Sequence, residues 1–356
     1  MWNRDQIRRF QARLLRWYRR HRRDLPWRDH PSPYNVWISE IMLQQTQVTS
    51  ALAFYLRFLN HFPDVQTLAR STEAEVLAEW AGLGYYSRAR NLHRAAKIIV
   101  EKFGGQFPDQ QSEAEKLPGI GRYTAGAILS IAFDKPSPVV DGNVRRVMDR
   151  LYAIKKPAPE QFYWRQAEAW TPRKHPGDFN QAVMELGALV CTPAHPRCDA
   201  CPVRFHCKAF PYGSQHRIPG RRAHHTPDKV ELVMLVFKRK DAIFLCRKQA
   251  VGYIPGEWGL PTRPLPKGES ADQLAQVMIR EVNGGVEEVQ TGTQVRHSIT
   301  HRRILCHVFL ISGIRSFRIR GTPTDFRWIK LLQLGRYLTS SVYRKAIQSA
   351  LRLAKL

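Results

Sequence analysis

One carboxylate lies in a long run of apolar and uncharged residues, the segment WISEIMLQQT at residues 37–46. In a helix, Trp37 and Leu43 would share a face with Glu40, because each lies three positions from it. An apolar, partly desolvated face raises the pKa of a carboxyl group and keeps its proton available for general acid catalysis. A glutamate on the solvated surface is the alternative interpretation. Glu40 is therefore a candidate for acid–base chemistry.

A second carboxylate, Asp141, stands at the expected start of a helix in the segment VVDGNVRR at residues 139–146. Aspartate is a common N-cap residue, since its side chain accepts hydrogen bonds from the first free N–H groups of a helix. Taken alone, this position favours a structural role.

Two glycines precede another helical run in the segment LPGIGRYTA at residues 117–125. Gly119 and Gly121 would let the backbone approach an anion closely, and the following helix would direct free N–H groups at it. We expect the anion to be a DNA phosphate, bound without base specificity. An ordinary turn between helices is the alternative.

Four of the six cysteines crowd into residues 191–207 with the spacing C-x6-C-x2-C-x5-C: Cys191, Cys198, Cys201 and Cys207. Four thiolates in a short loop can enclose a soft metal centre, which is either a tetrahedral zinc or an iron–sulfur cluster. The spacing by itself leaves both open. The other two, Cys246 and Cys306, lie in apolar strand patterns, and we expect them to be core residues.

The chain is strongly basic, with 56 Lys and Arg against 30 Asp and Glu and a net charge of +26. This charge favours a polyanionic partner, although a ribosomal or membrane-surface protein would also fit it. No apolar run approaches the roughly 18 residues that span a bilayer, and the first residues contain no signal-peptide core. We expect an intracellular protein without a membrane partner, cytoplasmic and nucleoid-associated if bacterial, in which disulfides are not expected.

The elements that must position these residues are mostly helical up to about residue 190. Apolar residues recur every three or four positions in the segments 7–18, 36–59, 73–80 and 122–133. Later in the chain, strands are predicted at 230–237, 242–246 and 304–311, and helices at 271–282 and 341–354. The basic, Pro- and Gly-containing segment 211–228 is typical of a linker. We therefore predict a helical domain at 1–210 and a smaller α+β domain at 229–356.

Several motifs resemble a known family. WISEIMLQQTQV, together with LPWRD at 25–29 and GLGYYSRARNLH at 82–93, resembles the A/G-specific, MutY-type adenine DNA glycosylases, over residues 15–210. The glycine hairpin, Asp141 and the cysteine spacing resemble the helix-hairpin-helix and iron–sulfur loop signatures of the wider endonuclease-III-like superfamily. The resemblance implies a mostly α helix-hairpin-helix glycosylase domain with a 4Fe-4S cluster in loop 191–207.

The resemblance also implies catalytic roles. Glu40 would protonate adenine at N7, Asp141 would stabilise or trap the oxocarbenium sugar, and Tyr123 would assist at the same site. This division of work between two carboxyl groups follows the logic of glycoside hydrolysis.

The same resemblance implies a pocket and a DNA surface. The residues expected to line the adenine pocket are Trp27, Arg28, Leu43, Asn143 and Glu185. Gln45 and Tyr85 would wedge into the duplex while adenine is flipped out. Further DNA contacts are expected at Gly119, Gly121, Arg122 and Arg145. Core positions for Leu43 and Tyr85, and a surface amide for Gln45, are the alternatives.

One position distinguishes two kinds of glycosylase. Members that also cleave the strand carry a Schiff-base lysine two positions after the second glycine, where this chain has Tyr123. A phenol cannot form an imine. We therefore predict a monofunctional enzyme.

The later part of the chain, including the segment 251–261, resembles the Nudix-like domain appended to these glycosylases, which senses oxidised guanine. The paired-glutamate box is broken, because Arg280-Glu281-Val282 is followed by Asn283-Gly284-Gly285, so hydrolase activity is not expected. Where the family often has Phe-Ser-His, this chain has Ile299-Thr300-His301. Thr300 and His301 are candidates for contact with the opposite base, and an ordinary polar loop is the alternative.

The sequence thus predicts a monomeric adenine DNA glycosylase of base excision repair. Its substrate would be double-stranded DNA that contains A:8-oxoguanine or A:G mispairs. A bifunctional enzyme for pyrimidine lesions and a non-catalytic DNA-binding protein with a structural cluster are the competing hypotheses.

Overall fold

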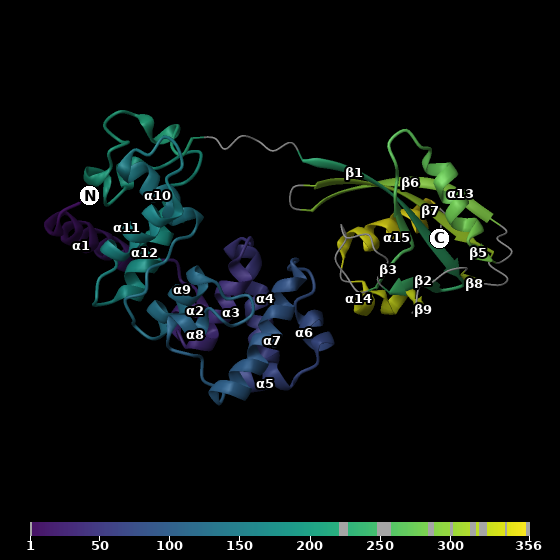
Figure 1. The fold of residues 1–356 in the computed structure, drawn as a ribbon, viewed down its shortest axis with the longest axis horizontal. Helices are drawn as coiled ribbons and strands as arrows, with labels where there is room; N and C mark the ends of the chain where they lie inside the picture. Colours follow the sequence, from purple (N-terminus) through teal and green to yellow (C-terminus); the bar gives the residue numbers. More distant parts are fainter. Residues whose placement is uncertain are drawn as a thin grey trace. The chain divides into compact units, whose positions relative to one another are not determined.

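The computed structural model describes residues 2–220, 227–247, 258–283, 288–299, 302–313, 318–319, 326–338 and 340–353. The chain forms two compact units, Met1–Ala223 and His224–Leu356 (Figure 1). Each unit is described by itself below.

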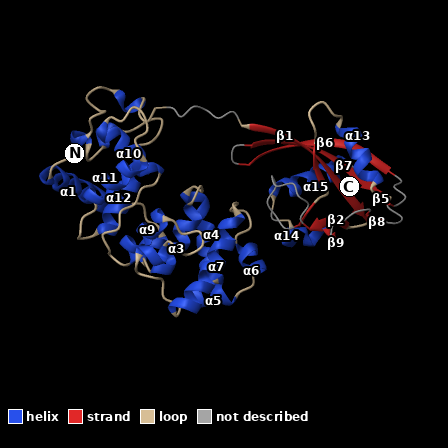
Figure 2. Cartoon of the chain, in the orientation of Figure 1, coloured by secondary structure: helices blue, strands red, loops and turns tan. Residues whose placement is uncertain are grey.

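The first unit is helical (Figure 2). Its helices are α1 (Arg4–His21), α2 (Pro26–Asp29), α3 (Pro33–Leu43), α4 (Val48–His61), α5 (Val65–Arg70), α6 (Glu73–Glu79), α7 (Tyr86–Phe103), α8 (Gln111–Ala114), α9 (Arg122–Ala132), α10 (Gly142–Tyr152), α11 (Glu160–Trp170) and α12 (Pro176–Leu189). Three 3₁₀ turns follow: η1 (Cys198–Ala200), η2 (Arg204–His206) and η3 (Ser214–His216). The prediction of a mostly helical first domain is confirmed.

Local chemistry explains where several of these helices begin. Asn3 and Gln6 form a reciprocal capping box at the start of α1, and Thr72 and Glu75 form another at α6. Pro33 occupies the first turn of α3, where its missing N–H is not needed.

The segment with helical periodicity at 36–59 forms two helices, α3 and α4, separated by residues 44–47. Gln45 lies there in the left-handed region, with φ 58°. That conformation is costly for a residue with a side chain, and apolar periodicity carries no signal for it. The break places the end of α3 beside a pocket.

Two apolar cores hold the first unit together. One lies around α3 to α7 and contains Trp37, Phe58 and Trp80. The other is formed by α1 and α10 to α12 and includes Phe10 and Trp170. The predicted linker differs from the structure at its start, because residues 211–220 belong to the first unit: Ile218 is buried there and its carbonyl oxygen accepts from Arg150 Nε at 2.8 Å.

The second unit is built on a mixed sheet. Its strands are β1 (Asp228–Arg239), β2 (Ala242–Arg247), β3 (Trp258–Gly259), β4 (Thr262–Pro264), β5 (Val282–Asn283), β6 (Glu288–Ile299), β7 (Arg302–Ser312), β8 (Arg318–Ile319) and β9 (Phe326–Lys330). The strand order in the main sheet is β3-β2-β1-β7-β6, with β4 paired to β1 and β9 to β2. Among the described strands, only β1 and β7 pair in parallel. Their register joins Asp228 to Arg302 and Phe237 to Ile311.

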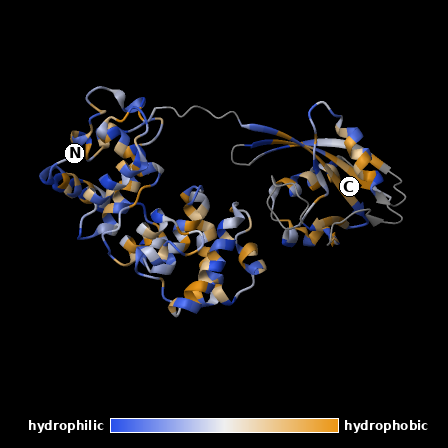
Figure 3. Ribbon diagram, viewed as in Figure 1, coloured by the Kyte–Doolittle hydropathy of each residue, from blue (hydrophilic) through white to orange (hydrophobic). Residues whose placement is uncertain are grey.

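The second unit's helices are α13 (Ala271–Arg280), α14 (Leu334–Tyr337) and α15 (Ser341–Leu353), with the 3₁₀ turn η4 (Leu331–Gln333). Successive side chains of β1 point to opposite faces of the sheet. Leu232 and Met234 pack in an apolar core with α15, whereas Val233 and Leu235 pack in a second core with α13. Both faces of the central strand are therefore covered, and hydrophobic residues (orange in Figure 3) gather along the sheet and its helices.

The prediction that the second domain contains both strands and helices is confirmed. The strands expected at 230–237, 242–246 and 304–311 lie within β1, β2 and β7, and Cys246 and Cys306 are buried in them as expected. The prediction missed β6, whose many polar residues gave little apolar signal.

Candidate active site

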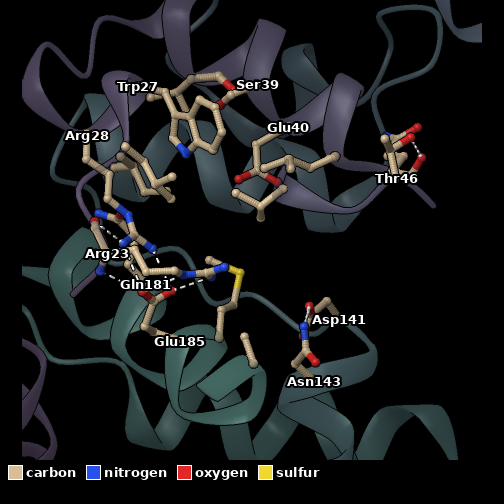
Figure 4. Close-up of a pocket in the computed structure, with 18 of the residues that line it drawn as sticks. Arg23, Trp27, Arg28, Ser39, Glu40, Thr46, Asp141, Asn143, Gln181 and Glu185 are labelled. Carbon is tan, nitrogen blue, oxygen red and sulfur yellow. Dashed lines mark hydrogen bonds and ion pairs between the residues drawn. The ribbon is translucent and has the colours of Figure 1, made fainter. Parts of the chain in front are cut away.

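The first unit contains a pocket of about 390 Å³ (Figure 4). All eight residues expected to do chemistry or hold a base lie on its wall, together with the expected wedge Gln45: Trp27, Arg28, Glu40, Leu43, Tyr123, Asp141, Asn143 and Glu185. They come from α2, α3, the loop after α3, α9, α10 and α12. Residues more than 150 positions apart therefore share one site.

Glu40 lies on α3 and is only 8% exposed. Tyr123 Oη, on α9, donates a hydrogen bond to Glu40 Oε2 at 2.8 Å and lies 3.3 Å from Met184 Sδ. Burial raises the pKa of Glu40 to about 7, and the charge of Asp141 adds to this effect. The hydrogen bond from Tyr123 and the charge of Arg28 act in the opposite direction. Near neutral pH this carboxyl group can hold or release a proton.

Asp141 is both an N-cap and a pocket residue. Its Oδ1 accepts from Val144 N at 2.7 Å, and its Oδ2 accepts from Asn143 Nδ2 at 3.0 Å. Burial raises the pKa of Asp141, whereas these hydrogen bonds lower it because they favour the ionised form. Asp141 is thus an N-cap, as its position in the sequence indicated, and it also lines the pocket.

Glu185 on α12 is in the opposite electrostatic situation from Glu40. It is 1% exposed, and its oxygens accept from Arg23 at 2.7 Å and Arg28 at 2.9 Å. Burial alone would raise the pKa of Glu185, but the hydrogen bonds from Arg23 and Arg28 lower it to about 2. Gln181 accepts a further hydrogen bond from Arg28 Nε at 3.1 Å. One glutamate of the pocket is therefore fixed as an anion, while the other titrates near neutrality.

Asn143 connects the pocket to the cysteine loop at 191–207. Its Oδ1 accepts from Arg146 Nη2 at 2.7 Å, and Arg146 Nε donates to the carbonyl oxygen of Cys191 at 2.8 Å. The helices α10 and α12 cross closely here, since a Cβ on Gly187 would lie 2.7 Å from Asn143 Cβ.

Gln45 and Tyr85 lie in two separate loops, and both have left-handed backbones, with φ 58° and 48°. Tyr85 is 43% exposed. Arg88, which is buried, joins the two loops: its guanidinium donates to the carbonyl oxygens of Ile41 and Met42 at the end of α3 and to that of Gly84. Burial lowers the pKa of Arg88 to about 10.

Gly119 requires glycine on two counts. Its φ is +80°, and a Cβ there would lie 2.9 Å from Asn91 Cβ. Gly121 is the N-cap of α9 with an extended backbone. The expected hairpin thus leads directly into the helix that carries Tyr123.

Arg122 and Arg145, expected to contact DNA, are occupied by intramolecular partners. Arg122 pairs with Glu168 at 2.9 Å and covers the ring of Trp164 at 4.0 Å. Arg145 pairs with Glu160 and lies over the ring of Tyr163. Thr300 and His301 lie outside the described residues.

The four cysteines of the loop line one cavity together with apolar side chains such as Val147 and Leu186. Arg150 Nη1 donates to Cys191 Sγ at 3.2 Å, and Cys207 Sγ donates to the carbonyl oxygen of Arg150 at 3.4 Å. Burial raises the pKa of Cys201 to about 12. Over the described residues, no three His, Cys, Asp or Glu side chains converge as they would around a single metal ion.

Sequence reasoning missed several functional candidates. Arg23, Gln181 and Met184 line the pocket, and Arg88 supports its rim. Arg23 stands two positions before the LPWRD motif and Arg88 lies within GLGYYSRAR, which are the only signals that the sequence offers for them.

Two family models match the chain. One is described as HhH-GPD superfamily base excision DNA repair protein and matches residues 38–172. The other is described as a NUDIX domain and matches residues 232–349. No helix among the described residues is both long and apolar enough to cross a membrane.

Proteins named adenine DNA glycosylase are similar over longer stretches. That of Buchnera aphidicola subsp. Baizongia pistaciae is 41% identical over 247 residues, which cover 68% of this chain and 70% of that protein. That of Schizosaccharomyces pombe is 30% identical, and the match covers 98% of this chain and 91% of that protein. The mouse protein is 45% identical over 60% of this chain, and the match spans 44% of the mouse protein.

Solved structures resemble the first unit. A thermostable thymine-DNA glycosylase is 27% identical with a TM-score of 0.55, over 58% of this chain and 98% of that one. A non-covalent endonuclease III–DNA complex is 22% identical with a TM-score of 0.53, over 60% of this chain and 100% of that one, and this likeness concerns the fold alone.

Proposed function

The chain belongs to the adenine DNA glycosylase family, within the HhH-GPD base excision DNA repair proteins, and we propose that it hydrolyses the N-glycosidic bond of adenine mispaired with 8-oxoguanine or guanine. One observation carries this proposal. A buried carboxyl group with a pKa of about 7, Glu40, shares a pocket with a second carboxyl group, Asp141.

In the proposed reaction Glu40 protonates N7 of adenine. The glycosidic bond then breaks, its electron pair leaves with the purine, and the positive charge that develops on the sugar is met by the carboxylate of Asp141. Water adds to the sugar carbon and releases a proton, which restores Glu40. The N–H groups of Val144 and Asn143 support the ionised form of Asp141 against the effect of burial.

Tyr123 supports Glu40 rather than replacing it. Its phenol holds Glu40 Oε2 at 2.8 Å and thereby fixes the orientation of the acid. A phenol at this position offers no amine for a Schiff base, so we propose a monofunctional enzyme that leaves the strand uncut.

The adenine would lie between apolar and charged walls. Trp27 and Leu43 supply apolar surface, and Arg28 is held in place by Glu185 and Gln181. Because both oxygens of Glu185 already accept from arginines, we assign Glu185 to the positioning of Arg28.

Gln45 and Tyr85 fit the role of duplex wedges, since each lies in a loop with a left-handed backbone beside Arg88. A flipped adenine leaves a gap in the stack that such side chains can fill. Gly119 and Gly121 would bind phosphate. We assign recognition of the opposite base to the second unit, with Thr300 and His301 as candidates.

We also propose that Cys191, Cys198, Cys201 and Cys207 hold a 4Fe-4S cluster. The donor set fits, because four soft thiols line one mostly apolar cavity. When bound, the cluster would hold the loop in place as a structural cofactor. Iron and sulfide analysis with visible absorption tests the assignment, and a colourless, zinc-loaded protein would refute it.

A single-turnover assay tests the function. We expect the protein to release adenine from A:8-oxoguanine and A:G duplexes, with strand breaks appearing only after alkali. Glu40→Gln should bind the mispair and fail to excise, and Asp141→Asn should lose excision as well. Near-normal cleavage by Glu40→Gln would remove Glu40 from its role, and binding without turnover by the unmodified protein would favour a non-catalytic DNA-binding protein.

A further inference from the structure

The exposed face of helix α1 is strongly basic. Over Arg4–His21 it has one aspartate and seven arginines, all of them exposed: Arg4, Arg8, Arg9, Arg13, Arg16, Arg19 and Arg20. In the part of the chain that the structure describes, none of the seven pairs with a carboxylate. Figure 3 colours this helix mostly at the hydrophilic end of the scale.

The arginines fall into two rows on the helix. Phe10, Leu14 and Tyr18 form the buried face. At about 100° per residue, Arg9, Arg13, Arg16 and Arg20 lie within about 60° of one another on one side of the exposed face. We call these four the arginine row. The other three, Arg4, Arg8 and Arg19, form a second row about 60° wide on the other side.

The arginine row adjoins the cysteine loop. The guanidinium carbon of Arg13 lies 5.2 Å from the ring centroid of Phe205, and that of Arg204 lies 5.1 Å from the same ring. Phe205 is 76% exposed, so the two guanidiniums and the ring between them face solvent. The ring of His206 in η2 also lies against α1, with its centroid 6.0 Å from that of Phe10.

We propose that the arginine row, with Arg204 of the cysteine loop beside it, binds phosphates of duplex DNA outside the mispair. This inference rests on the proposed function for its choice of polyanion. The row extends about 16 Å along the helix, which suits the regular charge array of a nucleic-acid backbone. A lipid surface fits less well, because the apolar face of α1 is already buried in the protein.

The test compares two triple variants of the full-length protein. Arg9, Arg16 and Arg20 are changed to Gln in the first, which retains Arg13 and its contact with Phe205. Arg4, Arg8 and Arg19 are changed to Gln in the matched control, which removes the same charge from the same helix. The dissociation constant of a fluorescent, lesion-free duplex is measured at several salt concentrations.

We expect the first variant to bind on the order of 100-fold more weakly near 150 mM salt, with a slope of log K against log salt that is shallower by about 2.7, or about 0.9 for each lost phosphate contact. The control should change by less than about threefold, since screening confines charge effects to about 8 Å. Changing Arg9, Arg16 and Arg20 to Lys should restore the slope.

Equal losses in the two triple variants would overturn the proposal in favour of net charge alone. An unchanged slope in the first variant would also overturn it, and would direct attention to another polyanion such as an acidic protein surface. Single-turnover excision at saturating DNA separates this outcome from the proposed function, because the row could fail to bind DNA while excision remains normal.

Discussion

Tyr123 donates its phenolic proton to Oε2 of Glu40 over 2.8 Å, between helices α9 and α3 and across 83 positions of the chain. The bond favours the ionised carboxylate, while burial favours the neutral acid more strongly and raises its pKa to about 7. The two opposing effects keep the acid titratable near neutrality.

Removal of that bond should move the pH dependence of excision. In Tyr123→Phe the carboxylate of Glu40 loses a donor, so its pKa should rise further. Because Glu40 acts in its protonated form, activity is lost as the pH rises through this pKa. We expect the alkaline limb of single-turnover base release to move upward by about one pH unit, with a plateau rate about tenfold lower because the acid is less well oriented. Tyr152→Phe, a phenol that bonds Gln166 elsewhere in the unit, should leave the limb in place.

Glu40 should also lower stability at alkaline pH. Its pKa is about 7 in the folded protein against a reference value of 4.5, so the folded state binds the proton more tightly. The resulting stabilisation is complete below pH 4.5 and is lost as the pH rises through 7. Glu40→Gln cannot ionise, and its Tm should exceed that of the unmodified protein by roughly 7–14 °C at alkaline pH. Equal Tm values at every pH would show that burial of the charged form costs nothing.

Glu185 should stabilise the fold in the opposite sense. Its pKa is lowered to about 2 by Arg23 and Arg28, so its contribution is present above its unfolded pKa and is lost as the pH falls through 2. At neutral pH, Glu185→Gln leaves the guanidinium of Arg28, whose side chain is only 9% exposed, without its anion and should cost about 3–5 kcal/mol in urea unfolding. Glu73→Gln, which breaks an exposed pair with Arg90, should cost less than about 1 kcal/mol. Similar losses in the two variants would contradict the assignment.

Arg88 should matter for base flipping more than for general DNA affinity. Lysine keeps the charge but cannot reproduce the planar fork that reaches Ile41, Met42 and Gly84. We expect Arg88→Lys to weaken binding of the mispair about tenfold, or about 1.4 kcal/mol, and to reduce the fluorescence of 2-aminopurine placed opposite 8-oxoguanine. Lesion-free duplex should bind as before.

Arg90→Lys is the matched control, because Arg90 lies on the same helix in an exposed ion pair. A loss of affinity for both kinds of DNA in Arg88→Lys, shared by Arg90→Lys, would mean that charge rather than geometry is responsible.

The residues that the sequence could identify are those whose neighbours already carry a signal. Glu40 stands alone in an apolar run, and that run becomes the buried helix α3. The capping position of Asp141 follows from a local rule, and the structure places it there.

Other features depend on contacts that no local pattern contains. Arg23 meets Glu185 from 162 positions away, and Arg88 reaches Ile41 from 47 positions away. The interruption between α3 and α4 needs a left-handed backbone at Gln45, which is stabilised by its surroundings and not by its residue type. Strands of the second unit were harder to predict where apolar and polar residues do not alternate regularly, as in β6.

The parallel pairing of β1 with β7 has a consequence for folding during synthesis on the ribosome. Phe237 must wait for Ile311, which is synthesised 74 residues later, before that edge of the central strand is covered. At about 5–20 residues per second, the delay is roughly 4–15 s. During that interval an apolar strand has no partner on this side, while the helical unit ahead of it has already been synthesised. The period in which apolar surface is exposed during synthesis is therefore set by the second unit.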